Sequence, residues 1–249
     1  MQIKAVLFDM FDTLMMIRKN NDFSSPSLMR TYRFLNKNGV DVSFDTFEKT
    51  YVKTRDDLYA KVDANLEEPH FNVRLSLTLK SLGYNYVVSS SMVTEATAEF
   101  CKEFMTFVYL DENTETVLHA LYGKYKLGII SNFAIPECVD ELLKTHGLTE
   151  LLDIIVVSAA VNKRKPSPEI FKNTLKTLGV SAKETVFVGD TLDADIDGAK
   201  RVGMKAVYIQ RRIENTDGHV KPDKIIKSLG ELPAALKELN NSILKRNLF

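Results

Sequence analysis

Val6-Leu7-Phe8-Asp9 is the stretch that decides the fold, because it is a short apolar run that ends on a carboxylate. Three further runs, at residues 127–130, 154–157 and 186–189, share this design, and each leads into a polar residue. Runs that are apolar throughout, without alternation, are typical of strands buried on both faces, as in a parallel sheet. Val207-Tyr208-Ile209 is predicted to be a fifth strand of this kind.

The segments that follow these strands carry helical signals. Residues 136–146, 168–178 and 193–202 each end at a glycine, the residue that commonly terminates helices. The alternation of strands with helices predicts an α/β fold, with a Rossmann-like parallel sheet between two layers of helices.

The alternation is interrupted between residues 16 and 110. Apolar residues recur there at helical spacing in four places, which predicts helices near residues 28–35, 44–62, 71–82 and 93–107. The same segment holds 14 of the chain's 23 aromatic residues, which supports a separate unit. We therefore predict a core formed by residues 1–15 and 111–249 and an all-helical domain inserted at residues 16–110.

Composition and charge limit the possible functions. Lys plus Arg equals Asp plus Glu, 33 against 33, which argues against nucleic-acid binding and against a polybasic membrane surface. No apolar run approaches the ~20 residues of a transmembrane helix. Cys101 and Cys138 show neither metal-ligand nor redox spacing, so we expect them to be buried and reduced. We expect a cytoplasmic protein that acts on a small molecule; the sequence carries no signal for an oligomeric state.

Polar residues at the predicted strand ends suggest phosphoryl chemistry. Ligands of parallel sheets bind at the carboxyl ends of the strands, where Asp9, Ser131 and Asp190 are expected to meet. Two carboxylates 4 Å apart repel by about 4 kcal/mol at an effective dielectric of about 20, and a divalent cation such as Mg²⁺ removes this repulsion. Lys165 would add a positive charge and Ser131 a hydroxyl donor. Such a set supplies the charge neutralisation and positioning that in-line phosphoryl transfer needs.

Four motifs, in order along nearly the whole chain, resemble those of the haloacid dehalogenase superfamily of hydrolases and phosphotransferases. They are Phe8-Asp9-Met10-Phe11-Asp12-Thr13-Leu14, Ile130-Ser131-Asn132, Lys165-Pro166-Ser167-Pro168 and Val188-Gly189-Asp190-Thr191. Each motif alone is weak, but four in order at strand ends are specific. The helical insert is similar to the helical cap of one subfamily, so the resemblance covers the core and the cap.

The resemblance implies roles for the matching residues. Asp9 is the expected nucleophile and would form an aspartyl-phosphate intermediate. Ser131 and Lys165 are the other expected catalytic residues. Thr13 and Asn132 are expected to bind the substrate.

The resemblance also implies a metal site. Mg²⁺ would be held by the side chains of Asp9 and Asp190 and by the backbone carbonyl of Phe11. The family's spacing makes Asp195 the expected partner of Lys165, outside the shell of groups that touch the metal or the substrate.

One position departs from the family's phosphatases. Two residues after the nucleophile they usually carry a second Asp, the general acid/base, where this chain has Phe11. A phenyl ring cannot protonate a leaving oxygen, and this contribution is typically about 10²–10⁴-fold. Asp12 is adjacent, but one step along a turn normally redirects a side chain. We therefore expect a Mg²⁺-dependent phosphatase for a small phosphorylated metabolite that favours good leaving groups.

Two alternatives remain open. The family's 2-haloacid dehalogenases need no metal, carry an aromatic residue at the position of Phe11, and use a cap arginine for the halide, for which Arg30 and Arg33 are candidates. They lack the pair that this chain keeps at Gly189-Asp190, which favours phosphoryl chemistry. The second alternative is a non-catalytic module that binds a phosphorylated ligand.

Overall fold

A six-stranded parallel sheet forms the centre of the core in the computed structural model, which describes residues 2–18, 23–211 and 220–246. The strands, in spatial order, are β5 (Ile154–Val157), β4 (Lys126–Ser131), β1 (Ala5–Phe8), β6 (Thr185–Gly189), β7 (Lys205–Ile209) and β8 (Lys224–Ile226). The five strands predicted from apolar runs are confirmed. The sequence analysis missed β8, which has three residues, one of them the exposed Ile225.

The register of the sheet brings the predicted strand ends together. β1 lies between β4 and β6, and Phe8 pairs with Ile129 on one side and with Val188 on the other. All residues of β1 are fully buried, as expected for a strand covered on both faces. Because the strands are parallel, the residues that follow them emerge at one edge of the sheet.

Helices cover both faces of the sheet, which confirms the three-layer α/β/α prediction. One face packs against α5 (Thr114–Leu121), α6 (Pro136–Thr145) and α10 (Leu232–Arg246). The other face packs against α8 (Pro168–Leu178) and α9 (Gly198–Arg201), and α7 (Ser158–Val161) directly follows β5. The alternation of side chains in β1 explains both contacts: Val6 and Phe8 belong to the first apolar cluster and Leu7 to the second.

The segment predicted as one helix over residues 193–202 is divided. Leu192–Asp197 is a π-helical turn, and α9 continues from it. The Thr191 carbonyl accepts from the backbone N–H of both Asp195 and Ile196, at 3.0 and 3.2 Å, so the helix is widened at its start. Such turns are frequent at functional sites because they displace a side chain from its regular position.

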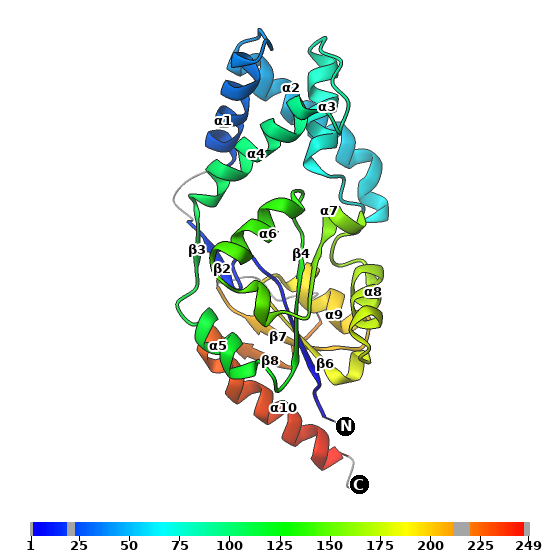
Figure 1. The fold of residues 1–249 in the computed structure, drawn as a ribbon. Coiled ribbons are helices and arrows are strands. Elements are labelled where there is room, and N and C mark those ends of the chain that lie inside the picture. Colours follow the sequence, from blue (N-terminus) through cyan, green and yellow to red (C-terminus); the bar gives the residue numbers. More distant parts are fainter. Residues whose placement is uncertain (1, 19–22, 212–219, 247–249) are drawn as a thin grey trace.

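Four helices form the cap above the core (Figure 1). They are α1 (Ser24–Lys37), α2 (Phe44–Val62), α3 (Phe71–Ser81) and α4 (Ser91–Met105), in agreement with the four predicted helices. The chain enters the cap through β2 (Met15–Ile17) and leaves it through β3 (Val108–Leu110), which pair as an antiparallel ribbon. The domain boundaries at residues 16 and 110 fall within this ribbon and stay a prediction.

Polar contacts fasten the cap to the core beside α3. Arg164 of the core donates to the Glu67 carbonyl at 3.0 Å and forms an ion pair with Asp63. The Phe71 backbone N–H donates to the Ala134 carbonyl at 2.9 Å. The loop that joins α2 to α3 is therefore held against the core at two places.

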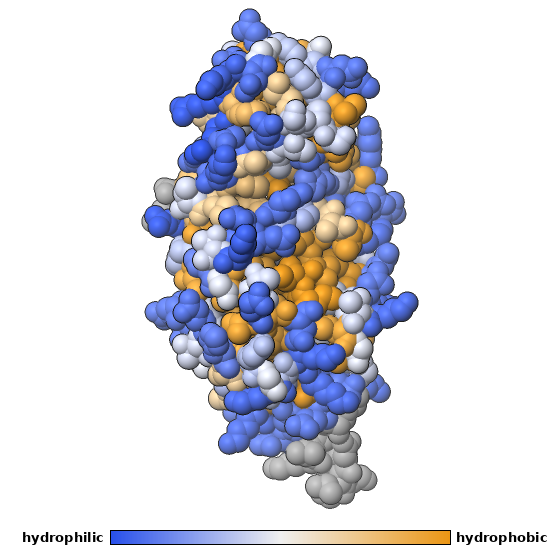
Figure 2. Space-filling view, in the orientation of Figure 1, coloured by the Kyte–Doolittle hydropathy of each residue, from blue (hydrophilic) through white to orange (hydrophobic). Residues whose placement is uncertain are grey.

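The described residues define the surface of the protein and the surroundings of its two cysteines. Within the described ranges, no helix combines the length and apolar character needed to span a bilayer. On the face shown in Figure 2, an apolar area lies over the core below the cap and is bordered by hydrophilic residues.

Cys101 of α4 and Cys138 of α6 are buried and form no disulfide. The neighbouring Cys101 thiol, together with burial, raises the pKa of Cys138, which disfavours its reactive thiolate.

Candidate active site

Lys165 lies buried between two carboxylates at the carboxyl edge of the sheet. Its Nζ is 2.6 Å from Asp9 Oδ1 and 2.7 Å from Asp195 Oδ1, and its side chain is 2% exposed. Asp190 completes the cluster, since carboxylate oxygens of Asp9, Asp190 and Asp195 all lie within 4.8 Å of one another. The structure thus brings together the residues that directly follow β1 and β6, a lysine from the loop before α8 and a carboxylate from the π-helical turn Leu192–Asp197.

The cluster carries an excess of negative charge. Asp9 and Asp195 share the ammonium of Lys165, and the buried carboxylate of Asp190 lies within 4.8 Å of both, so three carboxylates are gathered away from water. The pKa of Asp9 is raised to about 7: burial is the largest cause, the Lys165 ammonium opposes it, and the Asp195 and Asp190 carboxylates add to the rise. Burial alone would lower the pKa of Lys165, but Asp195 and Asp9 outweigh it and the pKa is raised.

This charge distribution fits a hard divalent cation. Oxygen ligands from one or two carboxylates are the usual protein contribution to a Mg²⁺ site. Lys165 uses one lone pair on Oδ1 of Asp9 and one on Oδ1 of Asp195, so the carboxylates of the cluster keep lone pairs that could bind a cation. Asp9 and Asp190, which come from adjacent strands, are the residues that could hold it.

Gly189 allows Asp195 to approach the end of β6. A Cβ atom placed on Gly189 would lie 2.6 Å from the Asp195 Cβ and 2.5 Å from its Cγ, closer than real contacts allow. Asp195 is held there by Lys165 and by the Thr191 backbone N–H, which donates to Oδ2 at 3.0 Å. The close approach of Asp195 therefore explains why the fourth motif has a glycine before Asp190.

The variant Gly189→Ala should displace Asp195 and loosen its ion pair with Lys165. We expect a loss of about 1–3 kcal/mol in the free energy of unfolding, the usual cost of overpacking, together with reduced activity. Urea unfolding monitored by circular dichroism measures the loss. Unchanged stability would show that Asp195 does not need this close approach.

Asn132 holds the backbone of Lys165. Its Nδ2 donates to the Lys165 carbonyl at 2.9 Å, and its Oδ1 accepts from the Lys165 backbone N–H at 2.8 Å. Both ends of the amide are thus engaged by one residue. Whatever contact Asn132 makes with a substrate, it positions the segment that carries the buried lysine.

The hydroxyl groups of Ser131 and Thr13, unlike the side chains described above, have no hydrogen-bond partner among the described residues. Both residues are fully buried, and neither Ser131 Oγ nor Thr13 Oγ1 has a hydrogen-bond partner among the residues that the structure describes. Buried hydroxyls without a partner are uncommon in folded proteins, and each one calls for an explanation.

Phe11 and Asp12 lie in the turn after Asp9, but their side chains face different surroundings. The Phe11 ring packs against Phe133 of the core and Phe104 of the cap, with centroids 5.0 and 5.6 Å away. Asp12 adopts a left-handed conformation with φ of 56°, and its Oδ1 accepts from the Ile17 backbone N–H at 3.3 Å. The Asp12 carboxylate is therefore used within its own turn, and its backbone conformation is one that glycine adopts readily.

Arg211 lies outside the four motifs but contacts the same turn. Its Nε donates to the Asp12 carbonyl at 3.0 Å and its Nη2 to the Thr13 carbonyl at 2.9 Å. Nη2 also forms an ion pair with Asp111, which follows β3. Arg211 thus connects the end of β7 to the turn that follows Asp9 and to the chain returning from the cap.

A cavity of about 280 Å³ lies between the cap and the loop after β4. It has aromatic walls and a few polar groups, and its lining includes Phe23, Tyr51, Tyr59, Phe71, Phe100, Phe133, Arg55, Glu68, Arg74 and Asn132. The sequence analysis did not find this cavity. One feature of the sequence could have indicated it: Arg74 is a charged residue on the same face of α3 as the buried Phe71, Leu75 and Thr78.

The two arginines considered for halide binding lie elsewhere. Arg30 forms ion pairs with Glu99 and Glu103 of α4, at 2.7 and 3.3 Å, and its side chain is 42% exposed. Arg33 lines the same surface depression as Arg30. Arg30 is therefore engaged on the surface of the cap.

The parallel sheet, the charged cluster at its carboxyl edge and the helical cap define a capped α/β hydrolase. Residues 10–209 match the family described as haloacid dehalogenase-like hydrolase. The chain belongs to this family, which confirms the resemblance drawn from the four motifs.

Known proteins similar to this chain include both phosphatases and dehalogenases. Glyceraldehyde 3-phosphate phosphatase from Methanopyrus kandleri is 28% identical over 214 residues, 84% of each chain. The structure of a phosphatase of this family from Thermococcus onnurineus is 27% identical, with a TM-score of 0.61 over 94% of this chain and 98% of that one. A 2-haloacid dehalogenase from Pseudomonas syringae has a TM-score of 0.72 over 96% of this chain and all of that one; at 22% identity it shows the shared fold alone.

Proposed function

We propose that this chain is a Mg²⁺-dependent phosphatase that hydrolyses a small phosphorylated metabolite. The observation that carries the proposal is the buried cluster of Asp9, Asp190 and Asp195 around Lys165. Relatives named glyceraldehyde 3-phosphate phosphatase, two of them 27–28% identical over most of this chain, support the substrate class.

Asp9 is the nucleophile of this proposal. Lys165 binds its Oδ1, which fixes the carboxylate and leaves the other oxygen to attack the phosphorus atom. The bond from phosphorus to the leaving oxygen breaks, and that oxygen keeps the electron pair. Water then attacks the phosphorus of the aspartyl-phosphate, and the bond from phosphorus to the Asp9 oxygen breaks. The carboxylate keeps the electron pair, and the protons of the water leave with the released phosphate.

The remaining residues bind the phosphoryl group and its metal. Asp9, Asp190 and the backbone carbonyl of Phe11 would hold Mg²⁺, which when bound compensates the charge of the phosphoryl oxygens. The hydroxyl groups of Ser131 and Thr13 would donate to phosphoryl oxygens, which supplies the partners they lack within the described part of the chain.

Protonation of the leaving oxygen is the weak step of this mechanism. Phe11 has no proton to donate, and the Asp12 carboxylate is bonded to the Ile17 backbone. Substrates whose leaving oxygen is stable as an anion need no proton. The preferred substrates should therefore be aryl or acyl phosphates, or esters with similarly good leaving groups.

A leaving-group series tests this proposal. We expect aryl and acyl phosphates to exceed alkyl phosphates in kcat/KM by about 10²–10⁴-fold, the usual contribution of general acid catalysis. We also expect a chelator to abolish turnover and added Mg²⁺ to restore it. Phosphate release measured across the series, with and without chelator, checks both expectations. Equal rates on alkyl and aryl esters would contradict the proposal that the site has no general acid. Full activity in the presence of a chelator would contradict the requirement for Mg²⁺.

Dehalogenation is the second candidate, and the aromatic side chain of Phe11 favours it. The Asp9–Asp190 pair and the surface ion pairs of Arg30 favour phosphoryl transfer instead. Release of chloride from 2-chloropropionate in metal-free buffer, without hydrolysis of any phosphate ester, would support the dehalogenase.

A further inference from the structure

We infer that Arg74, which lines the cavity under the cap, recognises an oxygen acceptor on the organic part of the substrate, at the end distant from the phosphate. The substrate class is then a small phosphate ester whose organic part carries a carboxylate or a carbonyl group. This inference rests on the proposed phosphatase function.

The cavity adjoins the catalytic cluster through two consecutive residues. Asn132 lines the cavity and holds the backbone of Lys165, whose Nζ binds Asp9. Phe133 also lines the cavity and packs against Phe11, two residues after the nucleophile. A phosphate ester bound at Asp9 would therefore extend its organic part toward the cap.

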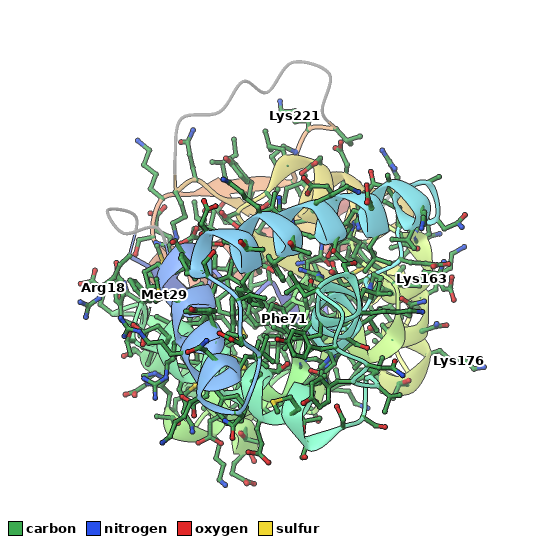
Figure 3. The ribbon with its side chains drawn as sticks, turned by 90° about the horizontal axis from the view of Figure 1, so that it is seen from above. Arg18, Met29, Phe71, Lys163, Lys176 and Lys221 are labelled. Atoms are coloured by element: carbon green, nitrogen blue, oxygen red, sulfur yellow. The ribbon has the colours of Figure 1, made fainter. Side chains whose placement is uncertain are left out.

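The walls of the cavity suit a compact organic group. Phe71, which packs against Tyr51 and Phe100 at centroid distances of 5.8 and 4.7 Å, contributes to an aromatic wall. In the view from above the cap (Figure 3), Phe71 lies near the middle of the molecule, whereas Lys163 and Lys176 lie toward its edge. The volume of about 280 Å³ is at the small end of ligand pockets, which favours a metabolite of few carbon atoms.

Arg74 supplies the polar recognition. Arg74 is 9% exposed. Its Nη2 donates to Glu68 Oε1 at 2.7 Å and to the Tyr59 hydroxyl. Its Nε is buried and has no hydrogen-bond partner within the described residues. The pair with Glu68 fixes the guanidinium, while the cost of an unpaired buried donor is removed only when an acceptor arrives.

The acceptor on the ligand is an oxygen atom. Glu68 offsets the charge of Arg74, so a neutral carbonyl oxygen and a carboxylate oxygen are both suitable partners for Nε. Arg55, the other cationic residue of the lining, pairs with the exposed Asp56 at 2.8 Å. Arg74 is therefore the cationic group that we assign to this recognition.

Three-carbon phosphate esters can show whether Arg74 recognises a carbonyl oxygen or a carboxylate oxygen. They have the same primary phosphate ester and differ only at the other end of the molecule. Glyceraldehyde 3-phosphate carries a carbonyl, 3-phosphoglycerate carries a carboxylate, and glycerol 3-phosphate carries neither. We expect kcat/KM for one of the first two to exceed that for glycerol 3-phosphate by about 10-fold or more, with the difference residing mainly in KM. The better of the two identifies the acceptor, and phenyl phosphate provides a reference without one.

The variant Arg74→Lys tests the residue. Lysine keeps a positive charge beside Glu68 but has no Nε donor, so the preference over glycerol 3-phosphate should fall to about 2-fold. Arg30→Lys is the matched control, because Arg30 is a cap arginine with two glutamate partners outside the cavity; it should keep the full preference. Calorimetric binding of the same esters to Asp9→Asn, with and without Arg74→Lys, measures recognition without turnover.

The outcomes distinguish this inference from the proposed function. Failure to hydrolyse any ester, phenyl phosphate included, contradicts the phosphatase. Hydrolysis of phenyl phosphate with equal kcat/KM for the three-carbon esters contradicts the cavity's role while the phosphatase stands. A preference retained by Arg74→Lys contradicts the assignment of Arg74. The comparison in the wild-type protein decides the question even where Arg74→Lys does not fold.

Discussion

Asp9→Asn is expected to lower phosphatase turnover by about 10⁴-fold or more, the scale seen when a nucleophile is removed. The amide has the shape of the carboxylate and can still accept from Lys165, so the protein should stay folded. It cannot, however, attack phosphorus as a carboxylate does. Release of phosphate from an aryl phosphate in excess Mg²⁺ measures the loss, and circular dichroism verifies the fold.

Asp193→Asn is the matched control for this variant. Asp193 lies in the same acidic segment as Asp195, but it is exposed and its Oδ1 accepts from the Ala194 backbone N–H. We expect its turnover to stay within about 2-fold of the wild type, since surface substitutions rarely have large effects. An Asp9→Asn protein that keeps a tenth of the wild-type turnover would contradict the nucleophilic role.

Lys165→Met should cost the protein both activity and stability. Without the ammonium, the carboxylates of Asp9 and Asp195 would be left buried and unpaired. Breaking a buried ion pair by removing one partner typically costs about 3–5 kcal/mol, and we expect a loss of this size in the free energy of unfolding. Urea unfolding at neutral pH in metal-free buffer measures it.

Two comparison variants identify the cause of that loss. Lys163→Met changes a neighbouring lysine that is 23% exposed and donates to the Asn65 carbonyl, so a change below about 1 kcal/mol is expected. The double variant Lys165→Met/Asp195→Asn should recover part of the stability, because one unpaired carboxylate is gone. Equal losses for both lysine variants would mean that the buried cluster does not need its central cation.

The core of the fold could be predicted because its strands are buried on both faces. Such strands need a continuous apolar run, and β1, β4, β5, β6 and β7 each contain one, although polar residues stand at the ends of β4 and at the start of β6 and β7. β8 lies at the edge of the sheet and is shorter, so its sequence carries a weaker pattern. The convergence of Asp9 and Asp190 at one edge of the sheet followed from the parallel arrangement alone.

The features of the site that could not be predicted depend on local backbone geometry and on contacts between segments far apart in the sequence. The left-handed conformation of Asp12, which leaves its carboxylate facing Ile17, is set by a turn and not by a periodic pattern. The two hydrogen bonds between Asn132 and Lys165 join residues 33 positions apart. Arg74 and the cap cavity similarly depend on packing between helices and a core loop.

The separation of the cap cavity from the charged cluster has an evolutionary consequence. The ionised groups that would break the phosphate ester all stand on the core, whereas most of the cavity wall comes from α1 to α4. Substitutions confined to those four helices can alter which molecule is accepted while the hydrolytic apparatus is inherited unchanged. Such a division lets one ancestral reaction diversify into many specificities through drift in a single inserted segment.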